Sequence, residues 1–150
     1  MLPALAPAAP ASGVATPRRR AALAATDDTN TRAGLLQMAD FLDESHTLAQ
    51  SSGDRDGDYW HAIMHRREPD PSNSKYWFRR VGDHPVFEEL GAAAAPILDA
   101  CGESIGPEWD PFAFVDLCER ARFGADESLR AACRRVQFLE MILLLQHGLR

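Results

Sequence analysis

Two histidines and a glutamate recur at helical spacing in the stretch "YWHAIMHRRE", residues 59 to 68. On an α-helix His61, His65 and Glu68 lie on one side, with neighbours in this set about 60° apart or less. Neutral imidazoles and carboxylates bind divalent metals such as zinc, and catalytic sites of this kind keep a further position open for water. We therefore expect these three residues to be candidate metal ligands, which either His46 or His84 could complete.

The same spacing has a second interpretation, in which no metal is bound. No glutamate follows the first histidine directly, as it does in the H-E-x-x-H motif, and Arg66 and Arg67 would repel a cation. The imidazoles would then donate hydrogen bonds to backbone carbonyls or to Glu68 at the edge of the core. If a metal is bound, Asp70 is available as a base for hydrolase-like chemistry.

Arginines and aromatic residues are concentrated around the turn that follows, so the hairpin is also a candidate binding surface. Its four arginines could converge on a phosphate or carboxylate through forked hydrogen bonds, and its second Tyr-Trp pair could stack on a planar ring. The candidate ligand-binding residues are His61, His65, Arg66, Glu68, Asp70, Asn73, Tyr76, Trp77, Arg79 and Arg80. In the alternative, nearby carboxylates neutralise the arginines: Glu68, Asp70, Asp83, Glu88 and Glu89.

Helical periodicity must position these residues. From residue 35 to residue 49 apolar side chains recur at steps of three and four, which predicts one helix of about 16 residues with His46 at the edge of its inward side. Asn73, Asp83 and Asp110 are predicted caps of later helices. No segment alternates with a period of two. We predict an all-α fold, a compact bundle or hairpin array of about six helices, beginning near residues 34, 58, 76, 83, 110 and 126.

Composition divides the chain of 150 residues near residue 34. Residues 1–33 are rich in Ala and Pro and are expected to be a disordered arm, and residues 34–150 are expected to form a single helical domain. The formal net charge of −6 argues against nucleic acid and acidic membranes as partners, because such binders need a positive excess. No apolar run approaches the roughly 20 residues of a membrane span.

Three cysteines stand far apart in the chain and in no metal-binding spacing. Cys101, Cys118 and Cys133 are therefore expected to be reduced thiols, which predicts a cytoplasmic location. The closing run "FLEMILLLQHGL" carries more apolar surface than one side of a small bundle needs, so we expect a homodimer through the C-terminal helix.

The runs "DESHTLAQ" and "YWHAIMHRREPDPSNSKYWFRRVGDHPVF" resemble a group of small, uncharacterised, predominantly bacterial proteins over roughly residues 35 to 145. The resemblance implies no activity and transfers no catalytic residue. Two functions remain open. The first is an intracellular helical module that binds a protein or small anionic ligand through the 59–84 hairpin. The second is a metal-dependent, hydrolase-like enzyme with a His/Glu site.

Overall fold

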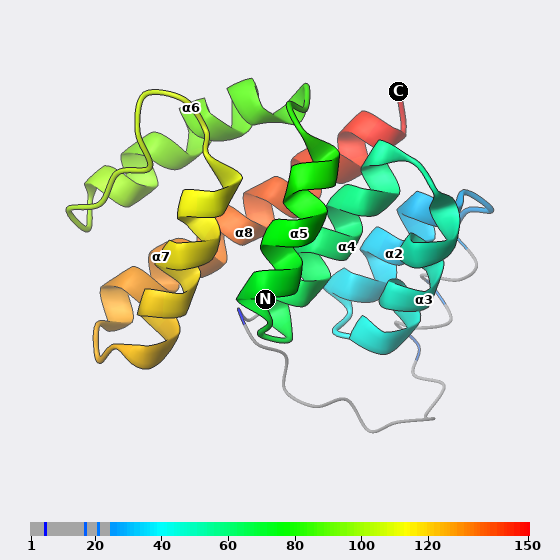
Figure 1. The fold of residues 1–150 in the computed structure, drawn as a ribbon, viewed down its shortest axis with the longest axis horizontal. Coiled ribbons are helices and arrows are strands. Elements are labelled where there is room, and N and C mark those ends of the chain that lie inside the picture. Colours follow the sequence, from blue (N-terminus) through cyan, green and yellow to red (C-terminus); the bar gives the residue numbers. More distant parts are fainter. Residues whose placement is uncertain (1–4, 6–16, 18–20, 22–24) are drawn as a thin grey trace.

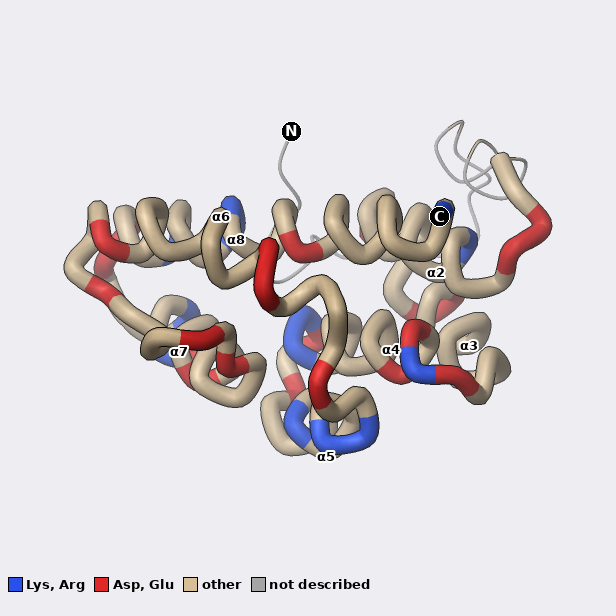
Figure 2. The backbone as a smooth tube through the Cα atoms, turned by 90° about the horizontal axis from the view of Figure 1, so that it is seen from above, with Lys and Arg blue, Asp and Glu red and all other residues tan. Residues whose placement is uncertain are grey.

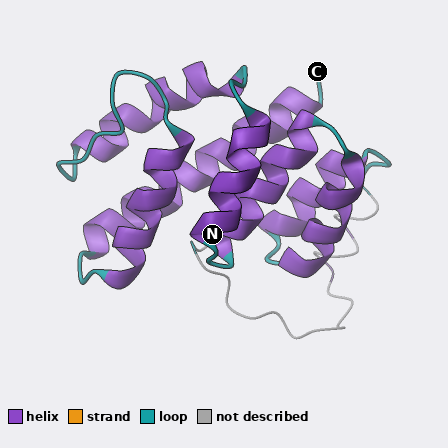
Figure 3. Ribbon diagram, in the orientation of Figure 1, coloured by secondary structure: helices purple, strands orange, loops and turns teal. Residues whose placement is uncertain are grey.

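The computed structural model describes residues 5, 17, 21 and 25–150, and this part of the chain is helical throughout, without a strand (Figure 1, Figure 3). The predicted all-α class is confirmed. Seven helices are described: α2 (Thr29–Met38), α3 (Leu42–Ser52), α4 (Arg55–Arg67), α5 (Pro71–Val81), α6 (Val86–Asp99), α7 (Pro111–Phe123) and α8 (Glu127–Gly148).

The helices are arranged in two layers. Helix α8 runs behind the others along most of the molecule in Figure 1, and the view from above places α6 and α8 in one layer and α3, α4, α5 and α7 in the other (Figure 2). Helix α8 packs against α2, α6 and α7, and α4 packs against both α3 and α5. Successive helices are therefore spatial neighbours over most of the first half of the chain, as short connections require.

The predicted helix over residues 34–49 is wrong, because the structure breaks it into α2 and α3. Asp40 lies at the break with a φ of +68°, a left-handed conformation that no continuous helix accommodates. The buried guanidinium of Arg67 donates to the carbonyl of Gln37 at 2.6 Å and to the Asp40 carboxylate at 2.5 Å. The guanidinium of Arg67, in α4, thus stabilises the corner between α2 and α3. Because of this corner the described residues form seven helices, where about six were predicted.

Aspartate carboxylates begin most of the helices by accepting backbone N–H groups that the first turn leaves unpaired. Asp110 caps α7, as predicted, with hydrogen bonds from two backbone N–H groups. The predicted cap Asn73 is wrong, since Asp70 caps α5, which starts at residue 71 instead of 76. Asp83 is not a cap either, because α6 follows Pro85.

The predicted disorder of residues 1–33 falls largely on residues outside the described part of the chain. Within the described part, α2 already begins at Thr29, so the helical domain starts earlier than residue 34. No described helix has both the length and the apolar character that crossing a membrane would need.

Candidate functional site

Helices α3 and α4 bring three histidines together. His61 and His65 stand one turn apart on α4, and His46 approaches them from α3, the helix that packs against α4. The ring centroid of His46 lies 4.5 Å from that of His61 and 5.3 Å from that of His65. The rings of His61 and His65 are stacked, with their centroids 4.8 Å apart. One nitrogen from each ring lies within 4.8 Å of the others. The sequence analysis expected His46 or His84 to complete a set of His61, His65 and Glu68. The structure brings His46 to the two α4 histidines, whereas Glu68 groups with His65 and Asp70 instead.

His61 is the most deeply buried of the three. Its side chain is 1% exposed, and neither ring nitrogen has a hydrogen-bond partner among the described residues. Trp77 of α5 stacks on the ring at 3.8 Å. Burial, together with the neighbouring imidazoles of His46 and His65, lowers the pKa of His61 to about 3. The ring is therefore neutral at physiological pH and keeps a lone pair, which is the form that binds a metal.

His65 is held by a carboxylate. Its Nδ1 lies 2.9 Å from Oε2 of Glu68, one turn further along, so Nδ1 carries the proton and donates it. This arrangement leaves Nε2 as the lone-pair nitrogen, the tautomer that carboxylate–histidine–metal triads use. Asp70 lies nearby but caps α5, where it accepts the backbone N–H of Asn73 at 3.2 Å and the Asn73 amide at 2.7 Å. These bonds lower the pKa of Asp70, so it is a weak base.

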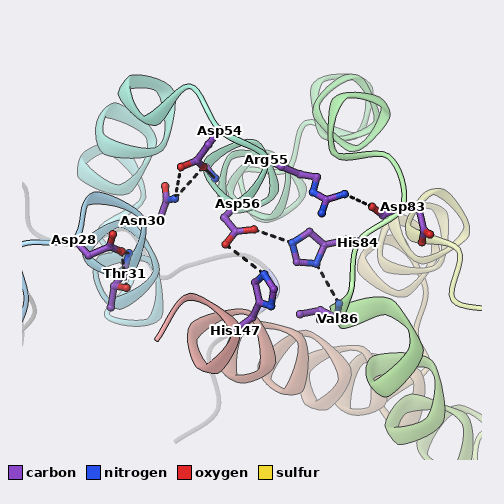
Figure 4. A network of polar contacts seen from close by, with 11 residues as sticks. Asp28, Asn30, Thr31, Asp54, Arg55, Asp56, Asp83, His84, Val86 and His147 are labelled. Carbon is purple, nitrogen blue, oxygen red and sulfur yellow. Dashed lines mark hydrogen bonds and ion pairs between the residues drawn. The ribbon is translucent and has the colours of Figure 1, made fainter. Parts of the chain in front are cut away.

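His84 does not join this cluster, and the structure places it in a second one at the other end of α4 (Figure 4). Its Nε2 lies 2.8 Å from Oδ1 of Asp56, and the Nε2 of His147, from the end of α8, lies 3.8 Å from Oδ2 of the same carboxylate. Sequence reasoning missed Asp56 and His147, because their separation in the chain carries no periodic signal. The second cluster joins α4, the α5–α6 turn and α8.

Both nitrogens of His84 are used by the protein. Its Nδ1 accepts the backbone N–H of Val86 at 3.2 Å, so the ring proton is on Nε2 and is donated to Asp56 (Figure 4). This hydrogen bond, with help from His147 and Arg55, lowers the pKa of the Asp56 carboxyl. Because a lone pair on Nε2 would place a proton on Nδ1 against the Val86 N–H, His84 is a poor metal ligand.

The two arginines of α4 point to different parts of the core. Arg66 forms a buried ion pair with Glu140 of α8 and contacts Gln137 at 3.3 Å, while Arg67 reaches Asp40 at the α2–α3 corner. Carboxylates neutralise these two arginines, as expected, but they are not the carboxylates that were expected. The actual partners are distant in sequence, where local charge counting cannot find them.

The exposed side of α5 carries the remaining candidates. Arg80 pairs with Asp58 at 3.2 Å, and its guanidinium carbon lies 5.0 Å from the centre of the Trp77 ring. Tyr76 is 47% exposed and meets the Trp77 ring edge-on, and Arg79 is exposed. The four arginines of the hairpin therefore do not converge on one concavity.

No protein-family model, curated protein or solved structure matches the chain. The site's chemistry consequently rests on its own geometry.

Proposed function

We propose that the protein is a metal-dependent, hydrolase-like enzyme that binds one divalent metal ion, zinc by preference, through His46, His61 and His65. The observation that carries this proposal is the state of His61, a neutral imidazole that is 1% exposed and finds no partner for either nitrogen in the described part of the chain. A buried polar group without a partner costs about 1–3 kcal/mol. A metal ion bound between the three rings would coordinate the unpaired nitrogen of His61 and so remove this cost.

The donor set fits a catalytic type of centre. Structural zinc sites usually have four protein ligands, whereas catalytic sites have three and keep a position for water or substrate. Three imidazoles meet here, and Glu68 orients one of them from outside. A bound divalent metal would supply Lewis acidity toward a carbonyl or phosphoryl oxygen and would acidify a water molecule. The carboxylate of Glu68 is 38% exposed and lies 2.9 Å from Nδ1 of His65, so it is a proton acceptor in contact with one of the three imidazoles.

The objection that neighbouring arginines would repel a cation loses force in this arrangement. Arg66 pairs with Glu140 and Arg67 pairs with Asp40, so a carboxylate offsets the charge of each guanidinium group. Arg80 is the cation that acts on His61, and Asp58 offsets its charge.

The other function considered from the sequence, binding of a protein or small anion through the 59–84 hairpin, stays a prediction. Its support in the sequence was the density of polar and aromatic residues in the hairpin and the lack of a sharp catalytic motif. Two arginines of the hairpin, Arg66 and Arg67, are occupied in the core.

Metal content tests the proposal. We expect purified protein reconstituted with zinc and then desalted to retain about one equivalent, and the doubly substituted His61→Ala, His65→Ala protein to retain none. His147→Asn is the matched control, because it removes an imidazole from the second cluster. Zinc-dependent cleavage of activated carboxylic and phosphoric esters, lost in the same double variant, would support the enzymatic part. Folded wild-type protein that retains no metal would contradict the whole proposal.

We also propose a homodimer through α8 and a cytoplasmic location. Phe138 and Ile142 on α8 are only partly buried, and neither belongs to the hydrophobic core cluster, which supports an apolar contact there. The three free cysteines support a reducing compartment. Light scattering that reports a monomer at micromolar concentration would contradict the dimer.

A further inference from the structure

A hollow lies away from the cluster of His46, His61 and His65. It is formed between the end of α5, the start of α6 and the loop that leads into α7. It has a volume of about 610 Å³, and an adjoining hollow of about 600 Å³ continues along α6. The two share one wall, formed by Asp83, Phe87, Pro107, Glu108 and Trp109. We call the combined surface the Trp109 groove.

The floor of the Trp109 groove is apolar and its rim is acidic. Phe87 and Trp109 lie in the floor of both hollows, and Phe112 extends it toward α7. The rim carboxylates Glu88 and Glu108 form no ion pair within the described part of the chain. Figure 2 shows Asp and Glu along the connection from α5 into α6 and along the loop before α7. Arg79 of α5 also lines the larger hollow, so the two hollows together are lined by one guanidinium and four carboxylates, those of Asp83, Glu88, Glu108 and Asp110. The charges of this surface thus fit a cationic occupant.

Trp109 adds an observation independent of the charge. Its side chain is 8% exposed, and its indole nitrogen has no hydrogen-bond partner among the described residues. The indole ring packs against Phe114 at 5.1 Å, so its position is fixed by the core. The indole nitrogen lies below the surface of the groove, so Trp109 contributes a fixed apolar ring to its lining.

We propose that the Trp109 groove binds an extended segment of a partner protein in which basic and apolar residues alternate. Apolar side chains of the segment would cover Phe87, Trp109 and Phe112. Lysine or arginine side chains on the other face of the segment would meet Glu88 and Glu108. Alternation suits this surface because successive side chains of an extended chain point to opposite sides. The surface is separate from the three histidines, so it can exist whether or not they bind a metal.

Fluorescence anisotropy with labelled octapeptide pools tests the proposal on the full chain. In one pool, arginine or lysine alternates with leucine, isoleucine, valine or phenylalanine. In the second pool, glutamate replaces each basic residue. We expect the basic pool to bind with a dissociation constant below about 1 mM and the acidic pool not to bind. No binding of the basic pool at that concentration would overturn the proposal.

Matched variants then locate the binding surface. The double variant Glu88→Gln, Glu108→Gln changes two exposed rim positions, and we expect it to weaken binding about fivefold. The control is Asp27→Asn, Asp43→Asn, which makes the same change of net charge at exposed positions outside the groove. Equal affinity of the rim variant and its control would overturn the proposal.

Discussion

The two histidine clusters at opposite ends of α4 contain the same chemical groups but treat them differently. In the cluster of His46, His61 and His65, no residue of the described ranges forms a hydrogen bond with either nitrogen of the His61 ring. In the cluster around Asp56, the central ring of His84 is equally buried, yet a carboxylate and a backbone N–H occupy both of its nitrogens.

This difference separates a candidate ligand from a structural histidine. The first cluster has three histidines, and the second has two together with a carboxylate. Each contains one deeply buried imidazole with close neighbours, so burial and proximity do not distinguish the clusters. What distinguishes them is the availability of lone pairs, because a metal needs a nitrogen that no proton and no N–H already uses. We therefore propose that one end of α4 binds a metal ion. The other end is held against α8 by noncovalent contacts.

The largest expected effect is on zinc affinity. We expect His61→Ala to weaken zinc binding by at least about a hundredfold, since each ligand of a zinc site contributes about 3 kcal/mol or more. Competition with a chromogenic chelator measures the affinity. His84→Ala, a truncation of the same size in the other cluster, should leave the affinity unchanged. A comparable loss in both variants would contradict the assignment.

For folding stability we expect the larger effect in the cluster around Asp56. His84→Ala should lower the free energy of unfolding by about 3 kcal/mol, because it creates a cavity and leaves the Val86 N–H and the Asp56 carboxylate without their partner. Urea denaturation of metal-free protein measures this change. His147→Asn should lower the free energy of unfolding by less than about 0.5 kcal/mol, because His147 is partly exposed and its ion pair with Asp56 is long, at 3.8 Å. A His84→Ala protein as stable as the wild type would remove the structural role.

The pH dependence of stability should reveal the lowered pKa of His61. Below its ordinary pKa of 6.5 the unfolded chain binds a proton that the folded chain, with a pKa of about 3, does not bind. Stability therefore falls as the pH falls, by about 1.4 kcal/mol per unit, or about 2 kcal/mol between pH 6.5 and pH 5.

Urea denaturation at both pH values, with chelator present, compares the wild type with His61→Phe. The variant lacks the titrating ring and should lose about 2 kcal/mol less than the wild type over this interval. An equal loss in the two proteins would show that His61 titrates normally.

The smallest expected effect concerns the orientation of His65. Glu68→Ala removes the acceptor of the Nδ1 proton but no proposed ligand, so we expect zinc affinity to fall about tenfold. Asp43→Asn, at an exposed position on α3, serves as the control and should bind zinc as the wild type does. Unchanged affinity in Glu68→Ala would mean that the carboxylate does not support the site.

Local rules predicted the parts of this protein that depend on local sequence. The helical class follows from the apolar periodicity, and Asp110 with Pro111 marks the start of α7 as expected. The proximity of His61 to His65 follows from their spacing on one helix. The corner at Asp40 could not be found in this way, because Arg67 stabilises it from 27 residues away in sequence.

The same limit applies to the candidate site. Spacing selected the two histidines of α4 and left His46 and His84 as equal alternatives. Tertiary packing decides between them, since α3 lies against the histidine side of α4 and the Val86 N–H occupies His84. The ion pair of Arg66 with Glu140 joins residues 74 positions apart, which no local pattern encodes.

X-ray absorption at the zinc edge of the reconstituted protein tests the central claim most directly, because it reports the kind and distance of the bound atoms. We expect three imidazole nitrogens at about 2.0–2.1 Å and one oxygen ligand that belongs to no imidazole ring. A spectrum without imidazole scattering, or one that His61→Ala leaves unchanged, would contradict the assignment of the three histidines as a metal centre.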